Sequence, residues 1–591
     1  MAELFGTPAD DILVGTSVSD TISGLDGNDV IDGVMGTDNL FGGDGNDRFV
    51  FSGIKFTSPE PQVGTIDGGN GFDEIDVSNL SPTAIYSNIL SLGNQKFELL
   101  NIERVTLGSG NNYISASNAP YEIISGSGID RLTITGAANV NAGAGNDYFF
   151  VSPSLGSKGA EFTSGILNGG DGVDTLATNI LAEVDLEAGT AKVWNASYTI
   201  SGFENVTVTG YSDSTKVRGD AKSNVITASD SSSAGVSFDG RGGNDLLTGS
   251  NYADTLRGGN GADRISGLGG ADFIFGDNGN DVIDALGDGD TIDGGSGFDS
   301  VKYLELTRTF SVSSGDMAAR VSSGSNTDRI STVENVEFRD ATLTFDADSN
   351  AAYVMRLYGS VLNREPDAVG LDSWLDRMDR GLSKVAVAEA FVGSPEFLRV
   401  TGSLSTPDFV EFLYTSALGR SSDAAGKANW VANIDAGLSR AEAVIGFSES
   451  NEHRALTSDT LAKGLWITDE NFQQVAALYD SFADRLPDKE GLLNWVSGLE
   501  LGTSSLKDVA DGFANSIEFS QKTGGLSNED LVEYMYQNTL DRGADPGGKQ
   551  AWVRALEGGM TKGELLLGFS SSEEHFTLIQ DHIYSGVEFL I

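Results

Sequence analysis

The sequence predicts a mainly β N-terminal part, a parallel β-roll or β-solenoid, followed by an all-α array of helical repeats. Two observations predict this order. Nine-residue units follow one another without a gap from residue 240 to residue 302, each with an aspartate at its sixth place and an apolar residue two places later. After residue 349 glycine becomes rarer, and a longer repeat with tryptophan, arginine and helical periodicity begins.

Each nine-residue unit has the composition of a turn followed by a very short strand. Glycines at the first, second and fourth places allow a tight turn with positive φ, which residues with a Cβ resist. The three residues after the aspartate form the strand, and its middle side chain points inward. Such units cannot bury an apolar face alone, so we expect them to stack with their turns in columns.

Stacked turns bring the sixth-place aspartates close together, and like charges at such spacing oppose folding. A hard divalent cation relieves the repulsion, and ligation by oxygen alone favours calcium over zinc. A metal-free glycine-rich solenoid is the alternative, but it does not explain why the aspartates keep one phase. The predicted metal ligands of this block are Asp245, Asp254, Asp263, Asp272, Asp281, Asp290 and Asp299.

This block resembles the RTX, or haemolysin-type, calcium-binding nonapeptide G-G-x-G-x-D-x-U-x. The resemblance implies that two units form one turn of a parallel β-roll, with calcium between consecutive turns of one column. Asp245, Asp263, Asp281 and Asp299 would then share one column, and Asp254, Asp272 and Asp290 the other. The glycine pattern is incomplete at the second or fourth place in some units, where Arg241, Ser250, Tyr252 and Asp288 stand.

A second in-phase block opens the chain at Gly6, with fewer glycines, so we expect fewer or weaker calcium sites there. Between the two blocks only isolated units remain, separated by alternating β-branched stretches that predict strands. The predicted ligands of the first block are Asp11, Asp20, Asp29, Asp38 and Asp47, and those of the isolated units are Asp73, Asp130, Asp147 and Asp174.

Three similar phrases recur in the β part: NIERV (101–105), GFENV (202–206) and TVENV (332–336). They predict three modules, each of which closes near one phrase. The acidic residue of each phrase is Glu103, Glu204 or Glu334. We expect it to be a charge on a surface strand, with a contribution to calcium binding as the alternative.

Four copies of a longer repeat make up the C-terminal part. Tyrosine, arginine, aspartate, glycine and tryptophan recur at fixed offsets, as in Tyr358, Arg364, Asp367, Gly370 and Trp374 of the first copy. The pattern resembles the DUF4214 family, Y-x5-R-x2-D-x2-G-x3-W followed by S-x-E-F. Each copy predicts about three helices. Exposed arginine and tryptophan would suit a glycan platform, but a tryptophan in constant phase is more often a core residue.

Helix-end signals are clear in the first copy. Asp367 and Ser394 suit N-caps, the latter before a proline at the first helical place, and Gly381 suits the end of the second helix. We predict four parts of the chain: a first β-roll (1–52), an irregular β-solenoid with scattered units (53–239), a second β-roll with closing strands (240–348), and four helical repeats with a C-terminal secretion signal (349–591).

Composition excludes several classes of function. A formal charge of −49 argues against nucleic acid or an anionic membrane as partner. The absence of cysteine excludes disulfides and thiolate metal sites, and the three histidines form no H-E-x-x-H pair. No uncharged apolar run approaches the roughly 20 residues that cross a bilayer. No nucleophile elbow, P-loop or dinucleotide fingerprint is present, so we expect no enzyme.

The residues before the first unit, Met1 to Phe5, are too few for a cleavable signal peptide. The RTX resemblance implies a different route, the type I secretion machinery, which recognises an uncleaved C-terminal signal. The last residues, 587–591, resemble the acidic-then-apolar tail of such substrates.

We therefore expect a secreted, calcium-dependent structural or adhesive protein of the bacterial cell surface, in an S-layer or biofilm matrix. Its expected partners are calcium, further copies of itself, and a cell-surface polysaccharide or lipopolysaccharide. Two alternatives stay open. One is a polysaccharide-modifying lyase or epimerase built on the middle β region, and the other is an RTX-type toxin.

Overall fold

The computed structural model describes residues 2–590, apart from 53–61, 81–83, 87–88, 93–94, 117–120, 153–164, 181, 195, 211–214, 230–233, 287 and 316–317. The chain forms two compact units. Unit 1 comprises Met1–Ala285 and Gly289–Asp299, and unit 2 comprises Leu286–Asp288 and Ser300–Ile591. Among the described residues no helix is both long and apolar enough to span a bilayer.

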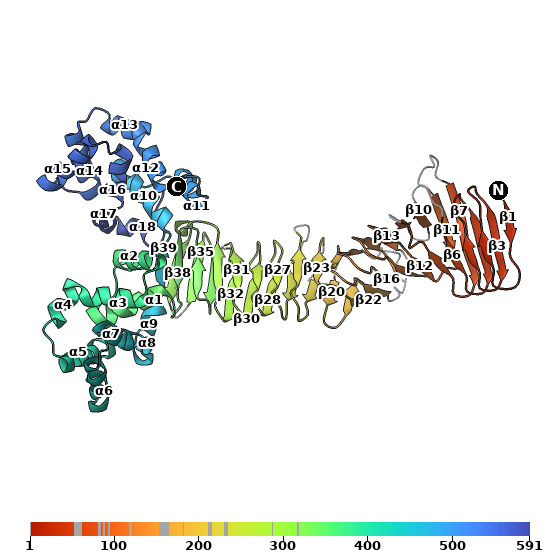
Figure 1. Cartoon of the computed structure of the whole chain (residues 1–591), viewed down its shortest axis with the longest axis horizontal. Helices are drawn as coiled ribbons and strands as arrows, with labels where there is room; N and C mark the ends of the chain where they lie inside the picture. Colours follow the sequence, from red (N-terminus) through yellow and green to blue (C-terminus); the bar gives the residue numbers. More distant parts are fainter. Residues whose placement is uncertain are drawn as a thin grey trace. The chain divides into compact units, whose positions relative to one another are not determined.

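Unit 1 is a β-solenoid whose strands alternate along the chain between two mainly parallel sheets (Figure 1). The first sheet contains β1 (Glu3–Phe5), β3 (Thr21–Asp26), β5 (Asn39–Asp44), β7 (Gln62–Asn70), β9 (Ala84–Tyr86), β10 (Ile89–Leu92), β11 (Gln95–Leu100), β13 (Tyr113–Ala116), β15 (Arg131–Ile134), β17 (Tyr148–Val151), β19 (Thr175–Thr178), β23 (Asn205–Val208), β25 (Val225–Ala228), β27 (Leu246–Thr248), β29 (Arg264–Ser266) and β31 (Val282–Ala285).

The second sheet faces the first across the core. It contains β2 (Ile12–Val14), β4 (Val30–Asp32), β6 (Arg48–Val50), β8 (Glu74–Asp76), β12 (Arg104–Thr106), β14 (Glu122–Ile124), β16 (Asn139–Asn141), β18 (Gly165–Asn168), β20 (Ala182–Asp185), β21 (Thr190–Val193), β22 (Ala196–Ser201), β24 (Thr215–Arg218), β26 (Val236–Asp239), β28 (Thr255–Asn260), β30 (Phe273–Asn278) and β32 (Thr291–Ser296).

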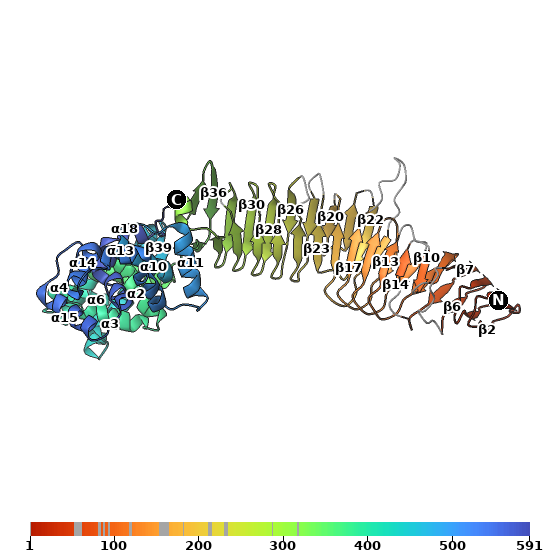
Figure 2. The same cartoon turned by 90° about the horizontal axis from the view of Figure 1, so that it is seen from above.

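The strand register confirms that two nine-residue units make one turn. Leu247 of β27 pairs with Ile265 of β29, which pairs with Ile283 of β31, so the step between neighbouring strands is eighteen residues. Figure 2 shows these short strands stacked one behind another along unit 1. The inward residue of each unit is fully buried, as predicted, in Ile22, Ile31, Leu40, Phe49, Leu247, Leu256, Ile265, Ile274, Ile283, Ile292 and Val301, whereas Leu13 in the first turn is half-buried.

Glycine has two different roles in the turns. Glycines at the second and fourth places adopt positive φ, as Gly259 (+110°) and Gly261 (+131°) do. Non-glycine residues at the second place adopt it too, including Leu25 (+84°) and Arg241 (+69°). The first place does not need positive φ, so that part of the prediction is wrong. Gly258 at the first place is instead required by close approach of its neighbours.

The three repeated phrases share one structural context. Each directly follows three successive antiparallel strands: β9–β11, β20–β22, or in unit 2 β34 (Ser311–Gly315), β35 (Ala318–Ser323) and β36 (Asn326–Ser331). The first residue of each phrase, Asn101, Gly202 or Thr332, has a φ between +50° and +66°. The left-handed residue redirects the chain from the antiparallel strands back into the parallel stack.

Unit 2 begins with strands and continues with helices. β33 (Ser300–Tyr303) pairs in parallel with β37 (Asn335–Glu337), and the antiparallel strands β38 (Ala341–Thr344) and β39 (Leu465–Thr468) extend this sheet. A 3₁₀ turn, η1 (Thr307–Thr309), follows β33. β39 lies between the second and third helical repeats, and no feature of the sequence predicted it.

Each repeat contains four main helices, one more than predicted, because the S-x-E-F segment forms a short helix of its own. The helices are α1 (Asn350–Leu357) with its π-helical extension η2 (Tyr358–Leu362), α2 (Ala368–Asp379), α3 (Lys384–Gly393) and α4 (Pro395–Thr401); α5 (Thr406–Leu418), α6 (Ala424–Asp435), α7 (Arg440–Ser448), α8 (Asn451–Leu456) and α9 (Ser458–Leu461); α10 (Glu470–Ala483), α11 (Lys489–Glu500), α12 (Leu506–Ala514) and α13 (Ile517–Thr523); and α14 (Asn528–Leu540), α15 (Pro546–Glu557), α16 (Lys562–Ser570), α17 (Glu573–Leu578) and α18 (Gln580–Ile583).

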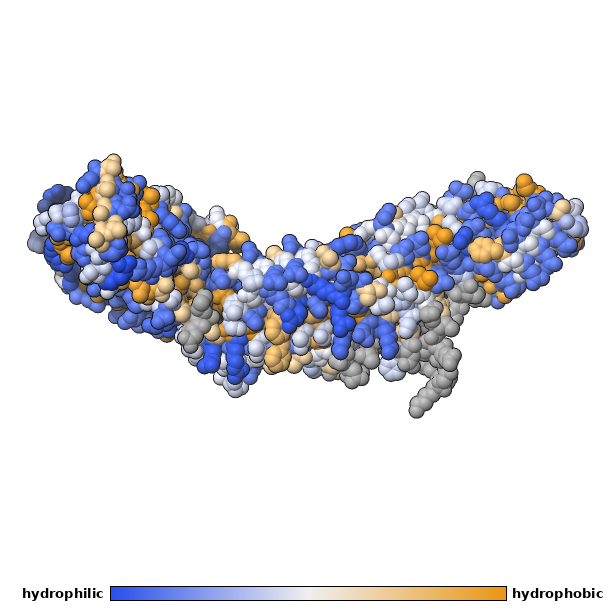
Figure 3. Space-filling model, turned by 90° about the horizontal axis from the view of Figure 1, so that it is seen from below, coloured by the Kyte–Doolittle hydropathy of each residue, from blue (hydrophilic) through white to orange (hydrophobic). Residues whose placement is uncertain are grey.

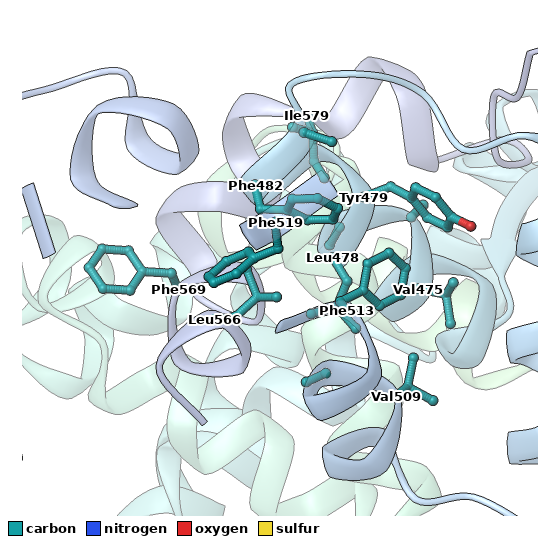
Figure 4. Packing of buried hydrophobic residues seen from close by; sticks show 14 of the residues in the cluster. Val475, Leu478, Tyr479, Phe482, Val509, Phe513, Phe519, Leu566, Phe569 and Ile579 are labelled. Carbon is teal, nitrogen blue, oxygen red and sulfur yellow. The ribbon is translucent and has the colours of Figure 1, made fainter. Parts of the chain in front are cut away.

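The predicted helix ends are confirmed. The Asp367 side chain accepts the Gly370 N–H at 2.8 Å, the Ser394 side chain accepts the Phe397 N–H at 3.2 Å, and Gly381 has a φ of +99°. The repeats pack in pairs, so the first and second share one hydrophobic core and the third and fourth share another. Figure 4 shows the second core, where Phe482, Phe513 and Phe519 lie close together.

Candidate calcium columns

The sixth-place aspartates of the second block form two continuous columns of hydrogen bonds. In each case one carboxylate oxygen, Oδ1, accepts the backbone N–H of the residue eighteen positions earlier. The first column runs from Asp245 through Asp263 and Asp281 to Asp299, with N–H to Oδ1 distances of 2.7, 2.8 and 2.8 Å. The second runs from Asp254 through Asp272 to Asp290, with two distances of 2.8 Å. The structure thus places these aspartates in the predicted columns.

The same hydrogen bond links the aspartates of the first block and of the middle region. The linked series are Asp11–Asp29–Asp47–Asp73, Asp20–Asp38 and Asp130–Asp147–Asp174, with distances of 2.7 or 2.8 Å. All of these aspartates are buried except Asp11, which lies in the first turn.

The other carboxylate oxygen, Oδ2, distinguishes one group of aspartates. It is buried and has no hydrogen-bond donor within the described part of the chain in Asp29, Asp38, Asp47, Asp73, Asp147, Asp174, Asp245, Asp263 and Asp281. A buried charged oxygen without a partner is costly, and native proteins rarely keep one without an ion or water. These nine oxygens therefore point to a cation.

First-place glycines open the space in which these oxygens lie. A Cβ added to Gly258 would lie 2.4 Å from Asp263 Oδ2 and 2.8 Å from the carbonyl oxygen of Gly276, one turn further on. The corresponding distances at Gly240 are 2.2 Å to Asp245 Oδ2 and 2.6 Å to the Gly258 carbonyl. Carboxylate and carbonyl oxygens thus converge beside these two first-place glycines, and calcium prefers such an all-oxygen donor set.

The electrostatics of these carboxylates also favour a bound cation. Burial raises the pKa of Asp38, Asp245 and Asp281 from 3.8 to about 7, and that of Asp73 and Asp147 to about 6. The backbone N–H donor opposes this rise, and neighbouring carboxylates add to it. A bound cation would favour the ionised carboxylates that burial disfavours.

Four other predicted ligands have a different environment. In Asp11, Asp20, Asp130 and Asp254 the Oδ2 atom accepts a hydrogen bond from a serine or threonine of the same turn. Thr16 donates to Asp20 Oδ2 from both its backbone N–H and its hydroxyl, at 2.7 Å each. Ser250 likewise donates its N–H to Asp254 Oδ2 at 2.6 Å. These turns satisfy the carboxylate without an ion.

Glu103 and Glu204 occupy positions in the columns, so the expectation that they are surface-strand charges is wrong. Asp73 donates its N–H to Glu103 Oε2 at 2.7 Å, and Asp174 donates its N–H to Glu204 Oε2 at 3.0 Å. Each glutamate ends a series of aspartates where the antiparallel insertion interrupts the parallel stack. The glutamate carboxylate thus accepts the same kind of backbone N–H as the aspartates of the columns do.

The arginines that recur in the helical repeats are partly exposed but paired, and the tryptophans that recur there are half-buried. Each arginine pairs with the glutamate of the S-x-E-F segment and lies over the tyrosine ring of its own copy, at 4.8–5.1 Å. Each tryptophan is half-buried against a phenylalanine, with ring centroids 4.9–5.5 Å apart. The core interpretation of tryptophan agrees with this packing.

Comparison with known families assigns both kinds of repeat. Residues 5–40, 14–49, 239–274 and 266–301 match the RTX calcium-binding nonapeptide repeat, and residues 331–400, 388–457, 462–523 and 510–579 match the domain of unknown function DUF4214. No curated protein matches the chain. The protein thus carries RTX calcium-binding nonapeptide repeats, in a β-solenoid, ahead of four DUF4214 repeats.

Proposed function

We propose that this is a secreted structural or adhesive protein of the bacterial cell surface, of the S-layer or biofilm-matrix kind, whose solenoid folds when calcium binds between its turns. The observation that carries the proposal is the series of nine buried aspartate oxygens without hydrogen-bond donors. The proposed ligands are those nine aspartates, together with Asp272, Asp290 and Asp299 of the same columns.

Calcium dependence and secretion support each other in this proposal. Extracellular calcium modules bind with dissociation constants of about 10⁻⁴–10⁻³ M, far above cytosolic calcium levels. The ligands are brought together only by folding, so binding and folding are one event. The solenoid would therefore stay unfolded in the cytosol, suited to type I export, and become rigid outside. RTX and DUF4214 repeats without a catalytic motif favour a non-catalytic role.

One surface of unit 1 supports adhesion to an acidic polysaccharide. Tyr113, Arg131 and Tyr148 are cross-strand neighbours on β13, β15 and β17, and line a hollow of about 430 Å³. Arg131 forms no ion pair with any described residue, although the chain is strongly acidic. Aromatic faces flanking a free guanidinium suit a uronate-containing chain. Over the face drawn in Figure 3 hydrophilic side chains predominate, and hydrophobic ones lie in small separate groups. Loss of polyuronate binding in Arg131→Ala would support this surface, and unchanged binding would exclude it.

Far-UV circular dichroism of the full chain during a calcium titration tests the central proposal. At growth temperature we expect little β signal in chelator and a cooperative gain at submillimolar to millimolar calcium, with magnesium far less effective because it demands octahedral geometry. On cooling in chelator we expect the solenoid to fold, with a low Tm. Equilibrium dialysis should then show several calcium ions per chain. A β signal that is already complete in chelator and does not change with millimolar calcium would overturn the proposal.

A further inference from the structure

One turn of the middle region carries asparagine where the columns otherwise carry aspartate. Asn112 is fully buried and stands one turn before Asp130, to which it donates its backbone N–H at 2.6 Å. It therefore occupies a column position, although residues 107–115 lie outside the segments that match the RTX repeat.

The side-chain amide of Asn112 is surrounded by oxygens. Its Nδ2 donates to the carbonyl oxygens of Gly108 at 3.0 Å, Gly110 at 2.8 Å and Ser125 at 2.9 Å. The Ser125 hydroxyl lies 3.3 Å from the same nitrogen. Four oxygens converging on one atom, from two consecutive turns, form a cage of the kind that a hard cation occupies.

Comparison with an aspartate turn identifies what the amide replaces. Ser125 opens the unit one turn after Asn112, as Gly276 opens the unit one turn after Asp263. The Gly276 carbonyl converges with Asp263 Oδ2 beside Gly258, and the Ser125 carbonyl instead accepts a hydrogen bond from Asn112. The NH₂ group supplies the positive partial charge that a cation would supply between the turns.

We infer that the Asn112 amide takes the place of a calcium ion, so that this turn packs without metal, and that Asn112→Asp would turn the cage into a calcium site. The inference rests on the proposed calcium binding of the aspartate turns. An aspartate there would take this donor from the Gly110 and Ser125 carbonyl oxygens and add a second carboxylate beside Asp130, while the Gly108 carbonyl would keep the Gly110 N–H. A cation would satisfy that set of oxygens and balance the added charge.

Asn224 is a second, related case. It donates its N–H to Asp245 Oδ1 at 2.7 Å, and its Nδ2 donates to the Glu204 carbonyl at 3.0 Å. Its Oδ1 accepts the Asp220 N–H at 2.9 Å. At Asn224 the Oδ1 atom, and not the NH₂ group, lies with the Gly240 carbonyl beside Gly219, so its arrangement differs from that of Asn112.

The test compares full-length wild type with Asn112→Asp and with Asn111→Asp. Asn111 is the exposed neighbour whose Oδ1 accepts the Ile129 N–H, and the variant keeps an acceptor oxygen while adding the same charge. Calcium per chain is counted by equilibrium dialysis, and thermal unfolding is followed in chelator and in calcium. We expect about one additional calcium in Asn112→Asp, a lower Tm in chelator, and recovery of the Tm in calcium, with Asn111→Asp like wild type.

The outcomes separate this inference from the proposed function. A wild type that binds no calcium overturns the proposed function itself. The inference alone is overturned if the wild type binds calcium but Asn112→Asp binds no more calcium than the wild type does. In that outcome the Tm loss of Asn112→Asp would not be recovered by calcium. If Asn112→Asp does not fold, the reverse variant Asp263→Asn still tests the inference. It should lose about one calcium and have a higher Tm than wild type in chelator, and a lower Tm there would contradict the inference.

Discussion

The two carboxylate oxygens of a sixth-place aspartate have different environments. Oδ1 accepts a backbone N–H from the previous turn, as Asp281 Oδ1 does from Asp263, and this bond fixes the side-chain rotamer. Oδ2 then points toward the first-place glycine of its own unit, as at Gly276, where an added Cβ would lie 2.4 Å from Asp281 Oδ2. The backbone thus holds one oxygen with a hydrogen bond and leaves the other without a donor.

Gly258→Ala tests whether the first-place glycine is needed for close approach. Its added Cβ would lie 2.4 Å from Asp263 Oδ2, so we expect weaker calcium binding and a loss of about 1–3 kcal/mol in the free energy of unfolding, as for other overpacked sites. Gly242→Ala is the matched control, because its Cβ would meet nothing closer than 3.7 Å. Equal effects in the two variants, by calorimetry and calcium titration, would contradict the assignment.

The pH dependence of the calcium-free solenoid follows from the raised pKa values. The pKa of Asp245 and Asp281 is about 7 in the fold, against 3.8 for an ordinary aspartate. Below about pH 4 these carboxyl groups are protonated in both the folded and the unfolded state, and the calcium-free fold is at its most stable. As the pH rises toward 7, the unfolded state releases the protons while the folded state keeps them, so the free energy of unfolding falls. We expect the Tm in calcium-free buffer to fall between pH 5 and pH 7.5.

Saturating calcium should reverse this dependence, since protons then compete with the cation for the same oxygens. Asp245→Asn and Asp281→Asn together should flatten the calcium-free profile. The measurement is thermal unfolding followed by the far-UV β signal. A calcium-free Tm that rises over this pH interval would show that the carboxylates are not buried in the apo fold.

At the scale of the element, the helical repeat is organised around one tyrosine. In the second copy the Tyr414 ring lies edge-on to Phe447 and carries the Arg420 guanidinium over its face. Its hydroxyl lies against Gly426 in the first turn of α6, the helix that Asp423 caps. The fixed spacing of Tyr, Arg, Asp, Gly and Trp therefore reflects one packing unit.

Gly426→Ala should disturb this unit, because the added Cβ would lie 2.3 Å from the Tyr414 hydroxyl. We expect a loss of about 1–3 kcal/mol in the free energy of unfolding, measured by denaturant titration followed at 222 nm. Gly393→Ala is the control, since it lies exposed at the end of α3 with nothing within 4 Å of the added Cβ. It should be neutral or stabilising by up to about 1 kcal/mol. Equal losses would mean that the tyrosine contact is not what requires glycine.

The histidines of the second and fourth copies show why the repeats pair. His453 contacts the backbone carbonyls of Ala417 and Arg356, and so joins the second copy to the first. His575 contacts the Ser570 carbonyl and the Asp480 carboxylate, and so joins the fourth copy to the third. The first and third copies have phenylalanine at this position. The alternation of Phe and His in the sequence therefore marks pairs of repeats.

Local periodicity was enough to predict much of the fold. The nine-residue phase predicted the β-roll, the eighteen-residue turn and the columns, because each depends only on neighbouring turns. The antiparallel insertions and β39 were not predicted, since their pairing depends on partners far along the chain, as Leu343 with Trp466. At the site, the sixth-place pattern found the aspartates but not Asn112 or Glu103, which fill column positions with a different residue type.

On the scale of the whole molecule, the two units differ in what holds them together. All nine buried aspartate oxygens without donors lie in unit 1. The helices of unit 2 instead have side-chain N-caps, as at Asp423 and Ser439, and two apolar cores. Removal of calcium should therefore leave the solenoid with unpaired buried charges and the helical cores intact.

We expect two thermal transitions, of which only the one followed by the β signal moves to lower temperature in chelator. Limited trypsin digestion in chelator should degrade the solenoid and leave a resistant fragment that begins near residue 300 and contains the DUF4214 repeats. In calcium the full chain should resist, because each proposed ion would tie two consecutive turns together and local opening would have to release it. Mass spectrometry of the fragment checks its boundary. A single transition in which helix and strand signals shift together with calcium would show that the helices depend on the solenoid for their stability.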